Sequence, residues 1–267
     1  MAFDPTGVDA DAPPAIDDRL VEPGTRYEML DGELVHVPPA DGPHGERQSQ
    51  LCALIEAHTG PEFKVAAELL TRTSRTDDFA PDVSVYLAAP DPVTQRRQLA
   101  QLAFEVVSTQ TLSHAGKKAA KLAARGVRRV FAIDVERSRA LEWSVALGGW
   151  SLLHTSGELA DPALRVPLPI ESLIHDAKSD DAVARALLAK NNAVLAANRA
   201  EGEAEGRARG KLEARAEHVV ELLVLRGVAL DQPARARILA ERDPARLDRW
   251  FARAVACSST AELFAEP

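Results

Sequence analysis

The amino-acid sequence predicts a mixed α/β (α+β) fold, in which helices flank a mixed sheet and a small helical module follows at the C-terminus. Three observations lead to this prediction. Short runs with strand character recur between residues 63 and 155, a helical pattern interrupts them near residues 114–125, and the chain becomes rich in Ala, Glu and Arg beyond about residue 169. With 267 residues and 46% hydrophobic content, the chain can bury a sizeable core.

The composition divides the chain into four expected regions. They are a disordered leader (1–20), a core domain (21–175), a helical linker (176–215) and a C-terminal helical module (216–267). The leader is acidic and proline-rich, and it lacks the basic start and apolar core of a signal peptide. No apolar run approaches the ~20 residues of a membrane span. We therefore expect a cytoplasmic protein that does not enter a membrane.

The core domain is expected to begin with a hairpin in RYEMLDGELVHVPP, where Asp31-Gly32 favours a tight turn between two short strands. A helix follows over residues 44–58, because Leu51, Leu54 and Ile55 recur at helical spacing. A second helix, over residues 114–125, separates two of the later strands. The predicted strands after the hairpin cover residues 63–73, 81–87, 101–108, 127–136, 140–148 and 150–155.

The region beyond residue 180 is expected to be mostly helical. Within it, Gly202, Gly206 and Gly210 recur every fourth residue, and each costs about 1 kcal/mol relative to alanine in a helix. This stretch is either a weak or close-packing helix or a flexible linker. Short helices follow in HVVELLVLRG, DQPARARILAE, DPARLDRWFARAV and SSTAELF, the last with Ser259 and Glu262 in capping-box spacing.

Charge and cysteine usage exclude several classes of protein. The 32 Lys and Arg residues are outnumbered by 40 Asp and Glu residues, which gives a net charge of -8. The protein as a whole is therefore not a basic nucleic-acid binder, and a polyanion would need a local basic patch. Cys52 and Cys257 lie far apart, match no zinc spacing and argue against a disulfide scaffold.

Two carboxylates and a basic helix follow one another in the core domain. Asp82 begins a predicted strand directly after a proline, and 23 residues later Glu105 lies inside the next strand, in LAFEVVST. From Glu105 to Asp134 the chain has no other acidic residue. At about 100° per residue, four basic side chains of the intervening helix share one face, opposite an alanine-rich face. They are Lys117, Lys121, Arg125 and Lys118.

This pattern suits metal-dependent hydrolysis of phosphodiester bonds. Two carboxylates on adjacent strands supply the oxygen ligands that Mg²⁺ prefers, a lysine can neutralise developing charge, and other basic residues can hold backbone phosphates. Each part alone also has a structural interpretation. Asp82 could cap a strand, Glu105 could pair with a core arginine, and the lysines could form a solvated face. It is the joint pattern that favours catalysis.

Residues 26–134 resemble the Uma-two family of restriction endonucleases within the PD-(D/E)XK nuclease superfamily. The matching segments are RYEMLDGELV, PADGPHG, APDVSV, FEVVSTQT and Lys118, which seven residues separate from Gly-Val, followed by FAID. The resemblance implies a restriction-endonuclease-like fold, with residues 21–175 as the nuclease domain. It implies that Asp82 and Glu105 bind metal and that Lys118 is the catalytic lysine, with Lys121 or Lys117 as fallback.

Other positions match or depart from the family pattern. Glu28 and His44 match family positions, without a catalytic role assigned to them. The departures are Ser108-Thr109-Gln110-Thr111 in place of Ser-Pro-Ser-Thr, His114 in place of an acidic residue, Leu122 in place of an aromatic residue, and Arg128-Arg129 in place of Pro-Glu. The metal-binding and lysine positions are kept although the flanking motif has drifted, so the resemblance implies the fold more strongly than the activity.

We therefore predict a Mg²⁺- or Mn²⁺-dependent endonuclease that hydrolyses DNA, with Lys117, Lys121 and Arg125 contacting the nucleic acid. One alternative is a catalytically weak nucleic-acid-binding or assembly module that retains the fold, and another is a protein that acts chiefly in oligomerisation. The tail resembles the helical module that follows nuclease-like domains in Rpn-type recombination-promoting nucleases and transposases. That resemblance implies an association or regulatory module. Because cutting both strands of a duplex needs two active sites, we expect a homodimer through the C-terminal helices.

Overall fold

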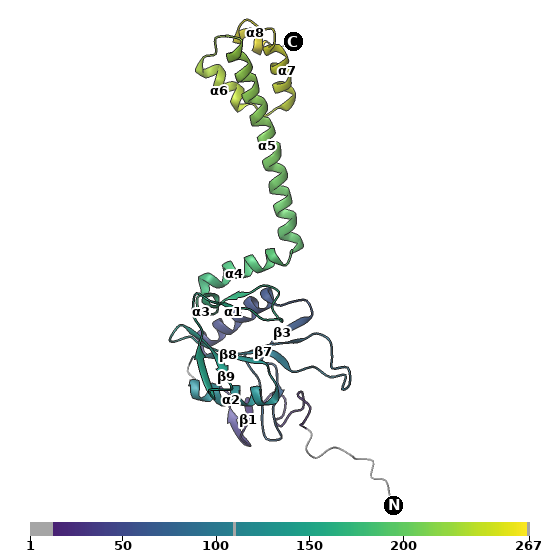
Figure 1. The fold of residues 1–267 in the computed structure, drawn as a ribbon, viewed down its shortest axis with the longest axis vertical. Helices are drawn as coiled ribbons and strands as arrows, with labels where there is room; N and C mark the ends of the chain where they lie inside the picture. The colour runs from purple at the N-terminus through teal and green to yellow at the C-terminus, as the bar shows by residue number, and fades with distance from the viewer. Residues whose placement is uncertain (1–12, 109–110, 266–267) are drawn as a thin grey trace, which may run out of the picture. The chain divides into compact units, whose positions relative to one another are not determined.

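The computed structural model describes residues 13–108 and 111–265, the side chain of Ala177 excepted. The chain forms two compact units, with the boundary between Asn192 and Ala193. The first unit contains the sheets and the second is helical (Figure 1). No helix in the described part of the chain is long and apolar enough to cross a membrane.

A six-stranded sheet forms the centre of the first unit, in the order β10-β9-β8-β7-β6-β3. Of these strands, β3, β7, β8 and β9 are labelled in Figure 1. β7 and β8 are parallel and are connected through α2 (Leu112–Arg125), whereas the other neighbours are antiparallel. This arrangement confirms the predicted mixed sheet. The strands are β3 (Phe63–Ala67), β6 (Val83–Leu87), β7 (Ala100–Val107), β8 (Arg129–Asp134), β9 (Arg139–Ser144) and β10 (Gly149–Leu152).

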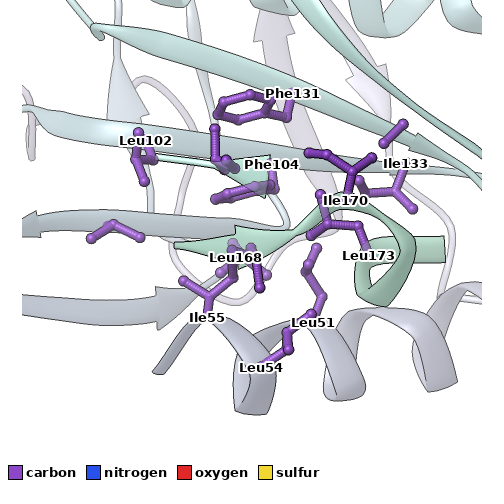
Figure 2. Close-up of a cluster of buried hydrophobic side chains, with 14 of the residues drawn as sticks. Leu51, Leu54, Ile55, Leu102, Phe104, Phe131, Ile133, Leu168, Ile170 and Leu173 are labelled. Atoms are coloured by element: carbon purple, nitrogen blue, oxygen red, sulfur yellow. The ribbon is translucent and has the colours of Figure 1, made fainter. Parts of the chain in front are cut away.

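The larger hydrophobic core lies on the face of this sheet that α1 (Gly42–His58) covers. Because side chains alternate along a strand, β7 directs Leu102, Phe104 and Val106 to this face, where Phe104 stacks on Phe131 with ring centroids 4.9 Å apart. α3 (Ile170–Ile174) and α4 (Asp176–Ala189) pack on the same side. Residues 176–189, expected in the linker, are thus part of the first unit. Figure 2 shows the side chains of this core, including Leu51, Leu54 and Ile55 of α1.

The opposite face of the sheet is covered by α2. There β7 presents Ala103, Glu105 and Val107, and the buried side chains of α2 pack around them. α2 ends at Gly126, whose positive φ of 115° lets its N–H and that of Val127 bond to the last carbonyls of the helix. Strand alternation therefore places Glu105 beneath α2 rather than in the larger core.

A smaller sheet of four short strands, in the order β2-β1-β5-β4, stands beside the central sheet. The predicted hairpin is confirmed, with Asp31 and Gly32 at positive φ in its turn. The single strand predicted over residues 63–73 is wrong, because Glu68 adopts a φ of 47° and the chain changes sheet there. The strands are β1 (Tyr27–Leu30), β2 (Glu33–His36), β4 (Thr71–Arg72) and β5 (Asp78–Phe79); β11 (Glu158–Leu159) and β12 (Leu168–Pro169) form a separate pair.

Part of the expected disordered leader is packed against the first unit. Ile16 is buried and its carbonyl accepts a hydrogen bond from the N–H of Arg72 at 2.9 Å. Arg96 pairs with Asp17 and Asp18 at 3.0 Å each. The prediction of disorder is therefore wrong for residues 13–20, because one apolar side chain and two carboxylates find partners; residues 1–12 lie outside the described part.

The second unit consists of α5 (Ala193–Leu225), α6 (Gln232–Ala240), α7 (Pro244–Ala254) and α8 (Thr260–Phe264). The glycine-rich stretch lies inside α5, so the helical alternative holds over the linker one. A compact core built around Leu223, Ile238, Leu247 and Trp250 confirms the predicted C-terminal helices. The capping box is confirmed in part: Ser259 accepts from the N–H of Glu262, whose carboxylate binds the N–H and hydroxyl of Ser258.

Candidate active site

Asp82 is held between α1 and β7 by three hydrogen bonds. Its Oδ1 lies 3.0 Å from Nε2 of His44, and its Oδ2 accepts from the N–H of Val106 at 2.6 Å. One turn along α1, Gln48 donates from its side-chain amide to the carbonyl of Asp82 at 3.2 Å. The ring of His44 occupies the first turn of α1, whose N-cap is Asp41. The carboxylate of Asp82 is therefore fixed in orientation from both sides.

Glu105 and Lys118 meet on the α2 side of the sheet. Nζ of Lys118 lies 3.9 Å from Oε2 of Glu105 and 2.9 Å from Oε2 of Glu28. Glu28 is held in turn, because its Oε1 accepts from the N–H of Ala80 at 2.9 Å. The side chains of Glu105 and Lys118 are each only 5% exposed, and the ammonium sits over the ring of Phe79 at 5.4 Å. This is a buried charged cluster.

The charges of this cluster are strongly perturbed. Burial raises the pKa of Glu105 to about 8, the positive charge of Lys118 offsets part of that rise, and Asp82 and Glu28 add to it. Burial lowers the pKa of Lys118, but Glu105 and Glu28 outweigh it and the pKa is raised overall. Near neutral pH the main ion pair is therefore between Lys118 and Glu28, while Glu105 is mostly protonated.

His44 and His114 are perturbed in opposite directions. The hydrogen bond to Asp82 raises the pKa of His44, which favours an imidazolium beside that carboxylate. Burial lowers the pKa of His114, and the nearby Lys118 lowers it further. The two imidazoles therefore differ in charge over a range of pH below neutrality.

A cavity of about 680 Å³ opens onto these groups. Within the described residues, no group of three or more His, Cys, Asp or Glu side chains is arranged to hold a metal ion. However, Oε1 of Glu105 is buried and has no hydrogen-bond partner there, which is costly for a polar atom. The site residues that line the cavity are Glu28, His44, Asp82, Glu105, His114 and Lys118.

The structure brings together Asp82, Glu105 and Lys118, the three residues predicted to form the active site. Of the residues predicted to contact nucleic acid, Lys117 is exposed and forms no side-chain hydrogen bond or ion pair with the described residues. The other two have intramolecular partners. Lys121 pairs with two aspartates, and Arg125 donates to two backbone carbonyls; the partners are Asp31, Asp77, Arg72 and Pro14.

The predicted division of α2 into a basic face and an alanine face is wrong. Lys118 is buried beside Ala119 and Leu122, whereas Ala120 and Ala124 are exposed. The four basic residues span about 100° of the helix circumference, which is wide enough to run from solvent at Lys117 to the core. The Lys118 edge of that arc faces inward, where the ammonium group pairs with Glu28 and Glu105.

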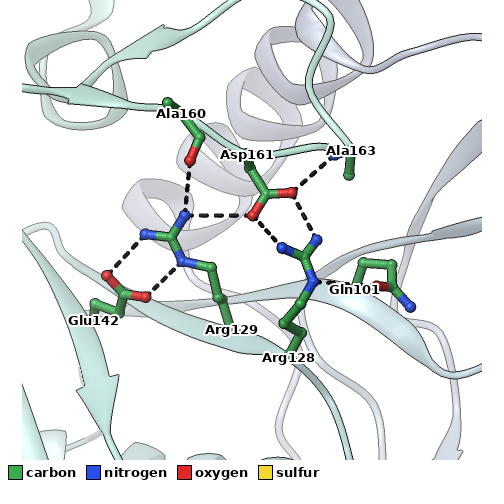
Figure 3. A network of polar contacts seen from close by, with 7 residues as sticks. All are labelled: Gln101, Arg128, Arg129, Glu142, Ala160, Asp161 and Ala163. Carbon is green, nitrogen blue, oxygen red and sulfur yellow. Dashed lines mark hydrogen bonds and ion pairs between the residues drawn. The ribbon is translucent and has the colours of Figure 1, made fainter.

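Arg128 and Arg129 are structural and lie away from the cavity. Figure 3 shows both guanidinium groups converging on Asp161, with Arg128 bonding it at 2.7 Å through two nitrogens. Arg129 also makes a bidentate pair with Glu142, at 2.6 and 2.9 Å. These arginines, which replace the family's Pro-Glu, fasten β8 to β9 and to the segment before β12.

Three residues of the site, His44, Glu28 and His114, received no role from the sequence. His44 and Glu28 match family positions, and Asp41, the N-cap of α1, places the side chain of His44 in the first helical turn. No local pattern in the sequence shows that this turn faces Asp82, because the two are 38 residues apart. Tertiary structure supplies that contact.

Two comparisons with known proteins found a match. The profile of the Uma2 family, described as "Putative restriction endonuclease", matches residues 15–171. The crystal structure of "a putative nuclease belonging to DUF820" from Anabaena variabilis ATCC 29413 is similar, with a TM-score of 0.47, 16% sequence identity, and coverage of 55% of this chain and 89% of that chain. A search of curated protein sequences gave no match. The family match spans more than half of the chain and confirms the resemblance drawn from its motifs, so the protein belongs to the Uma2 family.

Proposed function

We propose that the protein is a divalent-metal-dependent endonuclease that hydrolyses phosphodiester bonds in DNA. The observation that carries the proposal is Oε1 of Glu105, a buried oxygen without a partner among the described residues, in a side chain that lines a cavity together with Asp82 and Lys118. A buried carboxylate without its full set of partners is unfavourable. A cation that binds there would relieve this cost, so we take the donor set as fitting the metal.

Asp82 and Glu105 would hold the ion, and Mg²⁺ or Mn²⁺ fits a site made of carboxylate oxygens. Mg²⁺ is commonly bound by one or two carboxylates and retains several waters, so a site with fewer than three such protein ligands suits it. When bound, the ion supplies Lewis acidity and lowers the pKa of a coordinated water. Each oxygen of Asp82 keeps a free lone pair after its hydrogen bond.

The other side chains of the cluster have separate roles in this proposal. Lys118 holds its ammonium group beside the carboxyl groups of Glu28 and Glu105, where it stabilises negative charge that develops on the phosphate. Glu28 keeps that ammonium in place through the 2.9 Å ion pair. His44 orients Asp82, and Lys117, exposed in the second turn of α2, contacts a backbone phosphate.

Nicking of supercoiled plasmid DNA tests this proposal. We expect nicking that requires Mg²⁺ or Mn²⁺ and is abolished by EDTA, by Glu105→Gln and by Lys118→Ala. Lys211→Ala removes an exposed lysine of α5 and should leave the rate unchanged. Loss of nicking in Lys117→Ala or Lys121→Ala, but not in Lys118→Ala, would move the catalytic lysine to that position.

A non-catalytic alternative has a distinct outcome. Both oxygens of Asp82 already accept hydrogen bonds, an arrangement that also suits a nucleic-acid-binding module without hydrolysis. In that case the wild-type protein binds DNA in a salt-dependent manner and shows no metal-dependent nicking. Nicking that persists in both Glu105→Gln and Lys118→Ala would refute the assignment of the active site.

A further inference from the structure

Exposed aromatic and cationic side chains line the cavity in addition to the buried carboxylates. We call Arg19, Arg26, Tyr27 and His36 the outer wall; all four line the cavity and all are exposed. Tyr27 and His36 face each other across the β1–β2 hairpin, with ring centroids 5.4 Å apart and planes at 68°. Neither arginine forms a side-chain hydrogen bond or ion pair with the described part of the chain.

The two rings of the outer wall are exposed to solvent, which leaves them accessible to a base. Tyr27 is 44% exposed although it belongs to a strand, and the hairpin turn is already fixed by Asp31 and Gly32. A base can stack on an exposed aromatic ring only if its own face is free. In a duplex each base is stacked on its neighbours, whereas an unpaired strand can turn its bases onto a protein surface.

The size and depth of the cavity point to the same kind of substrate. About 680 Å³ lies in the range of pockets that enclose one small-molecule-sized group, and Glu105 and Lys118 at its floor are each only 5% exposed. A duplex is stiff over tens of base pairs and cannot fold into such a space while it stays paired. An unpaired nucleotide with its phosphate can enter.

We propose that the site accepts single-stranded or locally unpaired polynucleotide, DNA or RNA, with a base on Tyr27 and His36 and the adjoining phosphates on Arg19 and Arg26. This inference rests on the proposed nuclease function and specifies the form of its substrate. The strand would run from the outer wall toward Lys118, which brings a phosphate to the buried cluster.

Because carboxylates outnumber Lys and Arg side chains in the cavity, binding of a polyanion there depends on Arg19 and Arg26. Seven carboxylates line it against three Lys and Arg side chains, so the floor alone repels a polyanion unless divalent cations neutralise it. Each phosphate contact to a single strand contributes about 0.7 to the slope of log affinity against log salt concentration. Removing Arg19 and Arg26 should therefore lower that slope by about 1.4.

Fluorescence anisotropy of the full chain tests the inference. The protein carries Glu105→Gln to prevent cleavage, and Mg²⁺ is present at ~5 mM. It is titrated against labelled single-stranded DNA, single-stranded RNA and duplex DNA of equal length. We expect at least ~10-fold tighter binding to single strands than to duplex. Tyr27→Ala should weaken the binding of single strands about fivefold or more, which corresponds to a loss of at least about 1 kcal/mol of base stacking. Tyr27→Phe should retain binding.

The arginines are tested with a charge-matched control. Arg19→Ala with Arg26→Ala should weaken binding and lower the salt slope, whereas Arg165→Ala with Arg209→Ala, at exposed positions outside the cavity, should do neither. Equal affinity for duplex and single strand, or no effect of Tyr27→Ala, would overturn the inference. The DNA and RNA arms show which sugar the site accepts.

Cleavage rates keep the inference separate from the proposed function. If Glu105→Gln does not fold, the wild-type rates on single-stranded and duplex substrates replace the binding test, and faster cleavage of duplex would overturn the inference while the nuclease function stands. Selective binding of single strands by a protein that cleaves nothing would refute the function and retain the inference.

Discussion

The buried carboxyl of Glu105 should make the metal-free protein less stable as the pH rises. In the fold its pKa is about 8, against an ordinary value of 4.5, chiefly because burial disfavours the charged form. Between these two values the folded protein keeps a proton that the unfolded chain releases. The contribution of this group to stability is therefore fully present below about pH 4.5 and is lost as the pH rises to about 8.

The size of the effect follows from the difference between the two pKa values. At about 1.4 kcal/mol per pKa unit, the free energy of unfolding should fall by at most about 5 kcal/mol between pH 4.5 and pH 8 from this group alone. Glu105→Gln replaces the carboxyl with an amide of similar shape that does not titrate. Lys118 retains Glu28 as its partner in the variant, so its charge stays compensated.

Urea unfolding at several pH values from 5 to 8, with EDTA present, measures this difference. Other groups titrate in the same range, including His44 and the buried His58, but they are common to both proteins. The wild type should lose stability relative to Glu105→Gln as the pH rises, and addition of Mg²⁺ at pH 8 should restore part of it to the wild type only. A difference that is flat with pH, or a wild type that gains stability, would refute the buried-carboxyl argument.

Three further predictions concern the orientation of the site and the two cores. His44→Ala should lower the nicking rate about 10- to 100-fold by releasing Asp82, and His44→Gln, which can still donate to that carboxylate, should restore part of it; equal rates in the two variants would argue against an orienting role. Phe104→Ala should destabilise the first unit by about 3–5 kcal/mol in urea unfolding, since it removes a fully buried ring from the stack with Phe131. Leu223→Ala should cost the second unit about 2–5 kcal/mol, seen as an earlier loss of helical circular dichroism, and an unchanged midpoint would contradict its place in that core.

The elements that the sequence predicted best are those whose pattern is local. The β1–β2 hairpin follows from Asp31-Gly32, α2 is capped by Gly126 in the left-handed conformation, and α6 and α7 begin at an aspartate with a proline one or two residues later. Each signal depends on residues within one turn of each other. Such patterns hold whatever the rest of the chain does.

The features that the sequence could not predict depend on distant partners. Residues 63–73 read as one continuous strand, but the backbone turns at Glu68, whose N–H donates to the carbonyl of Asp82 at 3.2 Å. The acidic leader looked unable to pack, yet Arg96 pairs with two of its aspartates, Asp17 and Asp18, from 79 and 78 residues away. Neither contact leaves a signal in the local sequence, because the partner is brought near only by the completed fold.

The choice among the clustered lysines of α2 shows how local and tertiary effects combine at the site. Alternation along β7 sends Phe104 to one face and Glu105 to the other. At about 100° per residue, Lys118 lies closer than Lys117 to the buried Leu122 around the helix. Packing of the apolar side of α2 therefore buries Lys118 and leaves Lys117 in solvent. Burying an ammonium costs free energy that Glu28 and Glu105 must compensate. Glu28 does so at 2.9 Å while Glu105 stays 3.9 Å away with one oxygen unpaired, and under the proposed function this incomplete compensation is what would let the site accept a cation.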